Sequence, residues 1–199
     1  GLAPDACPQE RLYGSRPVAP CRRRRPERAS WCHALGFSEE GAADGLCIGF
    51  GWPARIDRAG RRGFAEVYRR AAPAGRGLGR LLSEIAAARP DLRIDMLTHS
   101  LGARVAMQAG LAEPGLPLGR LIFLAAAEHA AEAERFLAAM RGAPEVYHFL
   151  SRANDPYDAL FALVAPAPAD GSARPLGRAG LGRGDPRWID IQLDHRAVG

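Results

Sequence analysis

Short apolar runs alternate along the chain with segments of helical periodicity. Runs of the buried-strand type lie at residues 46–50, 92–98, 120–127, 145–152 and 187–193. Between them, helical patterns lie at residues 63–90, 100–112, 129–142 and 156–164. Strands that alternate with helices indicate βαβ units. The pattern therefore predicts an α/β fold, with a mostly parallel sheet and helices on both of its faces.

The two ends of this pattern differ in composition. Residues 1–45 show neither period, because Pro, Arg and Gly interrupt them, and we expect an irregular N-terminal segment there. Residues 46–199 are the predicted α/β core, within which the Pro- and Gly-rich stretch 165–186 is a long loop. A chain of 199 residues suits one domain. We expect no membrane span and no signal peptide, because no apolar stretch is long enough.

Charge and cysteine content change this picture little. The net charge is +5, every one of the 27 basic residues is Arg, and the densest run is CRRRRPER at residues 21–28. No aromatic residues alternate with that run, so we interpret it as a solvated loop and expect no nucleic-acid partner. The cysteines form no C-x-x-C pair and have no matching His spacing, so we expect no metal site of the zinc type and no thioredoxin-type motif, with reduced thiols in the cytoplasm. They are Cys7, Cys21, Cys32 and Cys47.

The candidate chemistry lies in THSLG, residues 98–102, where a predicted strand meets a predicted helix. In an α/β sheet, reactive groups gather at the carboxyl ends of the strands. A sharp strand-to-helix turn would expose the Ser100 hydroxyl, and small residues two positions before and after it relieve the crowding. Gly102 fits this rule, whereas Thr98 is larger than the usual glycine. The N–H of Leu101 would then face a developing oxyanion. The alternative is that Ser100 is a plain helix N-cap.

The stretch LTHSLGARVA, residues 97–106, resembles the nucleophile elbow of α/β-hydrolases, in particular esterase- and lipase-like ones. It is most similar to a bacterial branch of α/β-hydrolases of uncharacterised activity, in which FGWPAR or FSWPS precedes the elbow. Here IGFGWPAR, residues 48–55, occupies that place. The resemblance covers about residues 45–193 and implies a serine nucleophile, Ser100.

The same resemblance implies a triad in the chain order Ser, acid, His. Asp155 follows the second strand after the elbow and is the predicted acid, although it could also cap the helix that begins beside it. Asp158 is the second choice. The base should follow the last strand, so it is either His195 or a histidine beyond the end of this chain. His129 and His148 are poorer candidates, because one opens a helix and the other lies within a strand.

A second oxyanion donor is often marked by an HG pair in this family, and no such pair occurs here. The chain also starts without Met and shows no early strands. We therefore expect a fold that lacks its N-terminal strands, in a chain truncated at both ends.

Two other interpretations remain open. GFGWPA, residues 49–54, matches a dinucleotide fingerprint, but Trp52 and Pro53 are poorly suited to approach a pyrophosphate. A non-catalytic hydrolase-fold protein, or an inactive fragment used for binding, is the stronger competitor. The preferred hypothesis is a cytoplasmic serine hydrolase that cleaves a small-molecule carboxylic ester or thioester without a cofactor.

Overall fold

The structure, a computed structural model, describes residues 47–56, 60–168, 172–182 and 184–194. Internal contacts divide the chain into two units, Gly1–Gly51 and Trp52–Gly199, and all of the helices and strands given below belong to the second. The predicted irregular segment 1–45 and the arginine-rich run 21–28 lie outside the described residues, as does His195.

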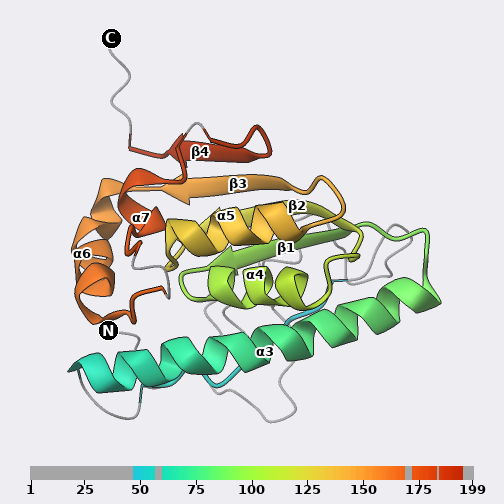
Figure 1. The fold of residues 1–199 in the computed structure, drawn as a ribbon, viewed down its shortest axis with the longest axis horizontal. Helices are drawn as coiled ribbons and strands as arrows, with labels where there is room; N and C mark the ends of the chain where they lie inside the picture. The colour runs from blue at the N-terminus through green and yellow to red at the C-terminus, as the bar shows by residue number, and fades with distance from the viewer. Residues whose placement is uncertain (1–46, 57–59, 169–171, 183, 195–199) are drawn as a thin grey trace, which may run out of the picture. The chain divides into compact units, whose positions relative to one another are not determined.

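A parallel four-stranded sheet forms the centre of this unit, with the strand order β1-β2-β3-β4 (Figure 1). Each strand pairs in parallel with the next, so all the carboxyl ends meet at one edge of the sheet. The prediction of an α/β fold with a parallel sheet is confirmed. The strands are β1 Ile94–His99, β2 Leu118–Leu124, β3 Glu145–Leu150 and β4 Trp188–Gln192.

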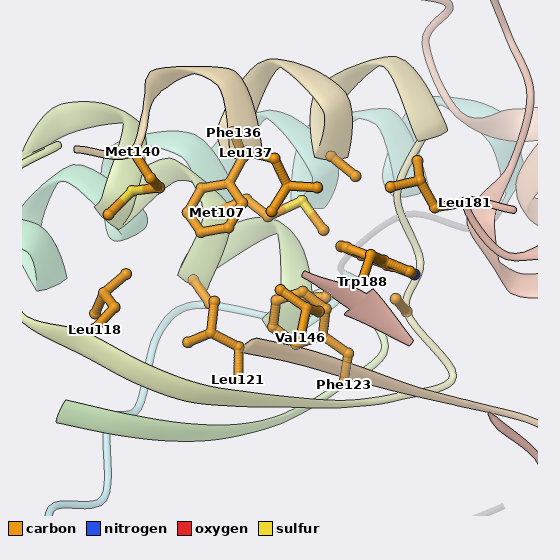
Figure 2. Packing of buried hydrophobic residues seen from close by; sticks show 14 of the residues in the cluster. Met107, Leu118, Leu121, Phe123, Phe136, Leu137, Met140, Val146, Leu181 and Trp188 are labelled. Atoms are coloured by element: carbon orange, nitrogen blue, oxygen red, sulfur yellow. The ribbon is translucent and has the colours of Figure 1, made fainter. Parts of the chain in front are cut away.

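Helices alternate with these strands along the chain. The α-helices are α3 Gly60–Ala88, α4 Gly102–Ala112, α5 Ala130–Ala139, α6 Asp155–Val164 and α7 Leu176–Ala179, and a 3₁₀ turn, η1 Arg152–Asn154, precedes α6. Helices α4 and α5, which connect successive strands, lie on the same side of the sheet (Figure 2). Helices α6 and α7 lie between β3 and β4 in the chain.

The core fills the space between the sheet and these two helices (Figure 2). Phe123 of β2 and Val146 of β3 point toward Met107 of α4 and Phe136 of α5, and all four side chains are fully buried. Burying one side chain of this size stabilises the fold by roughly 1.5–3 kcal/mol. The apolar strand runs identified in the sequence therefore form the sheet side of the core, opposite α4 and α5.

Two predicted features at the ends of the pattern differ from the structure. Residues 47–50, the described part of the predicted strand 46–50, have no regular secondary structure. An apolar run becomes a strand only where a neighbouring strand takes up its backbone hydrogen bonds, and the described residues offer it none. Within the predicted loop 165–186, α7 forms a short helical turn.

Among the helices in the described ranges, none combines the length and apolarity needed to cross a bilayer.

Helices α3 and α4 approach each other at backbone distance. α3 is 29 residues long, includes Pro73 and ends at Ala88, two residues before the end of the predicted helical pattern at Pro90. A Cβ atom added to Gly75 would lie 2.6 Å from the Val105 carbonyl oxygen, and one added to Gly79 would lie 2.8 Å from the Ala109 carbonyl oxygen. These glycines therefore set the distance between the two helices.

Gly75 and Gly77 of α3 form a matched pair for testing this contact. We expect Gly75→Ala to destabilise the fold by about 1–3 kcal/mol, because the new methyl group meets the backbone of α4. Gly77 has nothing within 4 Å of an added Cβ, so Gly77→Ala should stabilise the fold by about 0.5–1 kcal/mol through helix propensity. Urea unfolding of both variants measures the difference. Equal effects of the two substitutions would contradict the close approach.

Candidate active site

Ser100 lies in the turn between β1 and α4, at the carboxyl edge of the sheet. β1 ends at His99, Leu101 occupies the helix N-cap position, and α4 begins at Gly102. The φ angle of Ser100 is 54°, in the left-handed region that residues other than glycine rarely adopt. This conformation costs about 1–2 kcal/mol and persists only where neighbouring contacts enforce it. The strained turn expected from the sequence is present.

Backbone hydrogen bonds hold this turn against the end of the next strand. The Ser100 N–H donates to the Leu124 carbonyl at 3.0 Å, which extends the β1–β2 ladder by one residue. The Ser100 carbonyl accepts the Ala127 N–H and the Ala103 N–H, each at 3.1 Å. Both backbone groups of Ser100 are therefore satisfied in its strained conformation.

A steric constraint explains the glycine at position 102, two residues after the serine. A Cβ atom added to Gly102 would lie 3.3 Å from the Cβ atom of Thr98, a contact tighter than most. Two larger residues at these positions would therefore crowd each other across the turn. The threonine at position 98 is accommodated because position 102 is glycine.

The N-cap interpretation of Ser100 does not match the local geometry. The N-cap position of α4 belongs to Leu101, and no side chain caps the helix. The helix also begins two residues later than the sequence predicted. Across the described part of the chain, the Leu101 N–H has no acceptor. It is therefore available to an oxygen of a bound molecule, as an oxyanion donor must be.

Asp155 is the first residue of α6, which lies at the carboxyl edge of the sheet (Figure 1). Asn154 takes the N-cap position of this helix, and no side chain forms a capping hydrogen bond there. The capping role considered for Asp155 is therefore not seen. Its side chain is half-buried and lies in the strand-to-helix segment in which the sequence analysis placed the acid.

Asp158, the second candidate for the acid, is the more deeply buried carboxylate. Its exposure is 7%, its carboxyl group lies against Gly177 of α7, and its Oδ2 has no hydrogen-bond partner among the described residues. Burial, and then the negative charge of Asp155, raise the pKa of Asp158, while His148 opposes the shift. A buried oxygen without a donor is costly to the fold. It can also accept a hydrogen bond from a group that reaches this edge.

His148 is engaged inside the fold. It is fully buried, its Nε2 accepts the Ala126 N–H at 3.3 Å, and its Nδ1 donates to Asp190 Oδ1 at 3.0 Å. The same carboxylate oxygen accepts the Trp188 indole N–H at 2.8 Å. With both ring nitrogens occupied, His148 holds β3 against β4 and is not placed to accept a proton from Ser100.

The other described histidines also form no hydrogen bond to Ser100. His129 is 1% exposed, its Nε2 lies 3.0 Å from the Pro166 carbonyl oxygen, and its Nδ1 has no partner in the part of the chain that the structure describes. His99, at the end of β1, is exposed. His195 lies outside the described residues, so its role as the base stays a prediction.

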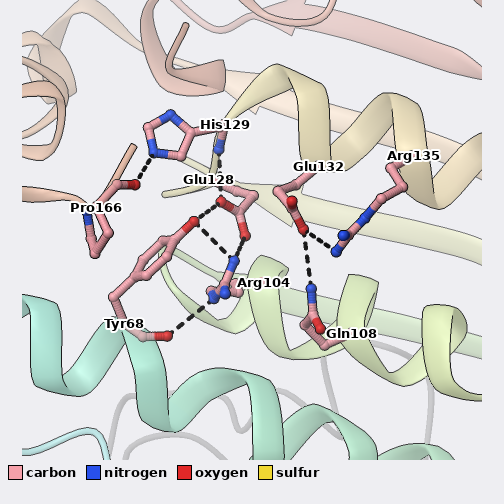
Figure 3. Close-up of polar contacts among 8 residues, drawn as sticks. All are labelled: Tyr68, Arg104, Gln108, Glu128, His129, Glu132, Arg135 and Pro166. Atoms are coloured by element: carbon pink, nitrogen blue, oxygen red, sulfur yellow. Dashed lines mark hydrogen bonds and ion pairs between the residues drawn. The ribbon is translucent and has the colours of Figure 1, made fainter. Parts of the chain in front are cut away.

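A buried polar cluster close to the turn was missed in the sequence analysis (Figure 3). It joins Tyr68 of α3, Arg104 of α4 and Glu128 of the segment after β2. These residues are far apart in the sequence and follow no common spacing. No pattern in the sequence indicates that they meet. The available signal was only that Tyr68 and Arg104 lie in two predicted helices.

No metal or nucleotide site emerges where the chain is described. Those residues contain no group of three or more His, Cys, Asp or Glu side chains that could hold a metal ion. The proposed dinucleotide fingerprint at 49–54 follows no strand, because residues 47–50 are irregular, and α3 begins only at Gly60. The fingerprint needs a strand, a tight turn and a helix in direct succession.

The raised pKa of Asp158 predicts a pH-dependent effect on stability. A carboxyl group whose pKa is higher in the folded chain than in the unfolded chain destabilises the fold once it is ionised. We expect Asp158→Asn to raise the midpoint of thermal unfolding at pH 7. The gain should disappear below pH 3.8, the ordinary pKa of the group, where both states are protonated.

Asp185 supplies a control of opposite sign. A hydrogen bond from Arg187 lowers the pKa of Asp185 from 3.8 to about 2. Asp185→Asn should therefore lower the midpoint at pH 7, and this loss should shrink as the pH falls from 3.8 toward 2. Melting curves of both variants across pH 2–7, measured by circular dichroism, test the pair. A gain for Asp158→Asn that does not vary with pH would contradict the assignment.

Comparison with known proteins identifies no relative of this chain: no family model, no curated protein and no solved structure matches it. A functional interpretation therefore depends on the turn at Ser100 and on the groups around it.

Proposed function

We propose that this chain is a serine hydrolase that cleaves a carboxylic ester or thioester through an acyl-enzyme. One observation carries the proposal: Ser100 adopts a positive φ in the turn that joins a parallel strand directly to a helix. Such a turn lifts the side chain clear of the sheet at the edge where reactive groups gather in α/β folds. The N–H of Leu101, which has no acceptor among the described residues, gives the proposal further support.

The reaction proceeds in two halves. The Oγ atom of Ser100 attacks the acyl carbon while a histidine takes up its proton, and the N–H of Leu101 binds the oxygen that becomes negative. The tetrahedral intermediate then breaks its bond to the leaving alcohol or thiol, which receives the proton from the histidine. Water attacks the acyl-Ser100 ester by the same route and releases the carboxylic acid. This chemistry requires no metal and no cofactor.

Two carboxylates are available to orient the histidine. We assign this role to Asp155, which lies at the first position of α6, and keep Asp158 as the second candidate. Within the described ranges the Oδ2 of Asp158 has no donor, which favours it as an acceptor for an imidazole N–H. The base itself is assigned to His195 or to a histidine beyond the chain end. The substrate is a small acyl ester, handled in the cytoplasm.

A non-catalytic role is the second candidate. Its support is that the described histidines either have their ring nitrogens engaged or are not bonded to Ser100. In that case the same turn would present a serine and backbone N–H groups as a binding site. Covalent chemistry at Ser100 separates the two candidates.

Reaction with a fluorophosphonate, measured by intact mass, tests the nucleophile. We expect one adduct on the wild-type chain and none on Ser100→Ala, because only an activated serine displaces fluoride from this reagent. Ser151→Ala is the matched control, since Ser151 is another half-buried serine at the end of a strand, and it should keep the adduct. Absence of any adduct on the folded chain would contradict catalysis and favour the non-catalytic role.

The rate of that reaction also separates the two carboxylates. We expect Asp155→Asn to slow labelling of Ser100 by at least about 100-fold, because the histidine loses its orienting acceptor. Asp158→Asn should slow it less, while raising stability as described above. A large loss of rate in Asp158→Asn with little loss in Asp155→Asn would transfer the role to Asp158. Equal wild-type rates in both variants would remove both from the triad.

A further inference from the structure

The buried carboxylate of Glu128 receives hydrogen bonds from three different groups (Figure 3). The Tyr68 hydroxyl donates to Oε1 at 2.5 Å, and the Arg104 guanidinium donates to Oε2 at 2.6 Å. The N–H of His129 completes the set by donating to Oε1 at 2.8 Å. Glu128 is 0% exposed, so this charge is removed from water and neutralised inside the protein.

Arg104 connects this cluster to the helix that begins at the serine turn. It lies four residues after Ser100, in the first turn of α4. Its Nε donates to the Tyr68 carbonyl at 3.0 Å, its Nη1 donates to the Tyr68 hydroxyl at 2.9 Å, and its guanidinium stacks 3.8 Å from the centre of the Tyr68 ring. The amino end of α4 is therefore fixed to α3 by several directional contacts.

Glu128 connects the same cluster to the other side of the turn. The residue before it is Ala127, whose N–H donates to the Ser100 carbonyl at 3.1 Å. The contacts thus form a closed circuit from Ser100 through α4 to Arg104, across to Glu128, and back through Ala127 to Ser100. The Leu101 N–H lies within this circuit.

We propose that Glu128, Arg104 and Tyr68 are positioning residues for Ser100, because they lock together the two segments that hold its strained turn and the N–H of Leu101. This inference rests on the proposed serine hydrolase activity. None of the three residues has to touch the substrate. They act through the backbone, where a displacement of about 1 Å is enough to reduce a rate by about 100-fold.

A purely structural role for the cluster would have a different signature. Loss of a buried contact would then lower the unfolding midpoint but leave the folded fraction fully reactive. The Tyr68 hydroxyl stays a donor throughout the working pH range, because burial and then the Glu128 charge raise its pKa well above the ordinary value of 10. The circuit is therefore intact wherever Ser100 can be assayed.

Two variants of the cluster and one control test the proposal. Tyr68→Phe removes a single hydroxyl, whereas Glu128→Gln removes the charge that Arg104 faces. Gln108→Ala is the control, because Gln108, like Arg104, links α4 to another segment through its side chain, here by a 3.2 Å bond to Glu132 of α5, but lies one turn further from Ser100 (Figure 3). If Glu128→Gln fails to fold, Tyr68→Phe carries the test.

Two measurements are made well below the unfolding midpoint of each variant. The second-order rate of fluorophosphonate labelling at Ser100 should fall by about 10- to 100-fold in Tyr68→Phe and Glu128→Gln, and stay within about 2-fold in Gln108→Ala. Hydrogen exchange of the Ala127 amide should accelerate in the same two variants only, because the hydrogen bond from this amide to the Ser100 carbonyl closes the circuit.

The outcomes distinguish this proposal from the proposed function. Labelling of all variants at the wild-type rate would overturn the positioning role while leaving the serine hydrolase intact. Equal amide acceleration in Gln108→Ala would also overturn it, since the effect would then be general loosening. If the wild-type chain does not react with the fluorophosphonate at all, the proposed hydrolase activity is overturned. The positioning role is then overturned too, because it rests on that activity.

Discussion

The hydrogen bond from the Ala127 N–H to the Ser100 carbonyl joins the ends of two adjacent parallel strands. Without it, the carbonyl of Ser100, whose φ is 54°, would keep only the local hydrogen bond from the Ala103 N–H and would lose its contact with the segment after β2. The bond exists because the register places Thr98 of β1 opposite Phe123 of β2. The candidate site is therefore an extension of strand pairing beyond the last paired residues.

The same arrangement recurs one strand further along the sheet. Ala125, directly after β2, also has a positive φ, of 48°, and its N–H donates to the Phe149 carbonyl of β3. Two adjacent strands thus leave the sheet through left-handed turns that their neighbours hold. The carboxyl edge is built as a row of mutually supporting backbone turns, and Ser100 occupies the one from which a helix starts.

Periodicity was sufficient to predict the repeating part of the fold. The apolar runs of β1 to β4 and the helical faces of α3 to α5 lie within a few residues of their expected positions, because each pattern is local. The serine turn was predictable for the same reason, since strand, serine and glycine follow one another in the sequence.

Features that depend on distant partners were not predictable. The apolar run at 46–50 needs a neighbouring strand, and the burial of Asp158 depends on Gly177, from a segment that the sequence described only as a loop. The hydrogen bonding of the buried Glu128 depends on Tyr68, which lies 60 residues earlier in the sequence.

The close contact of Gly75 and Gly79 with α4 restricts evolutionary change in the same non-local way. Substitutions can accumulate on the outer row of α3, whereas its inner row must keep glycine as long as α4 keeps its place.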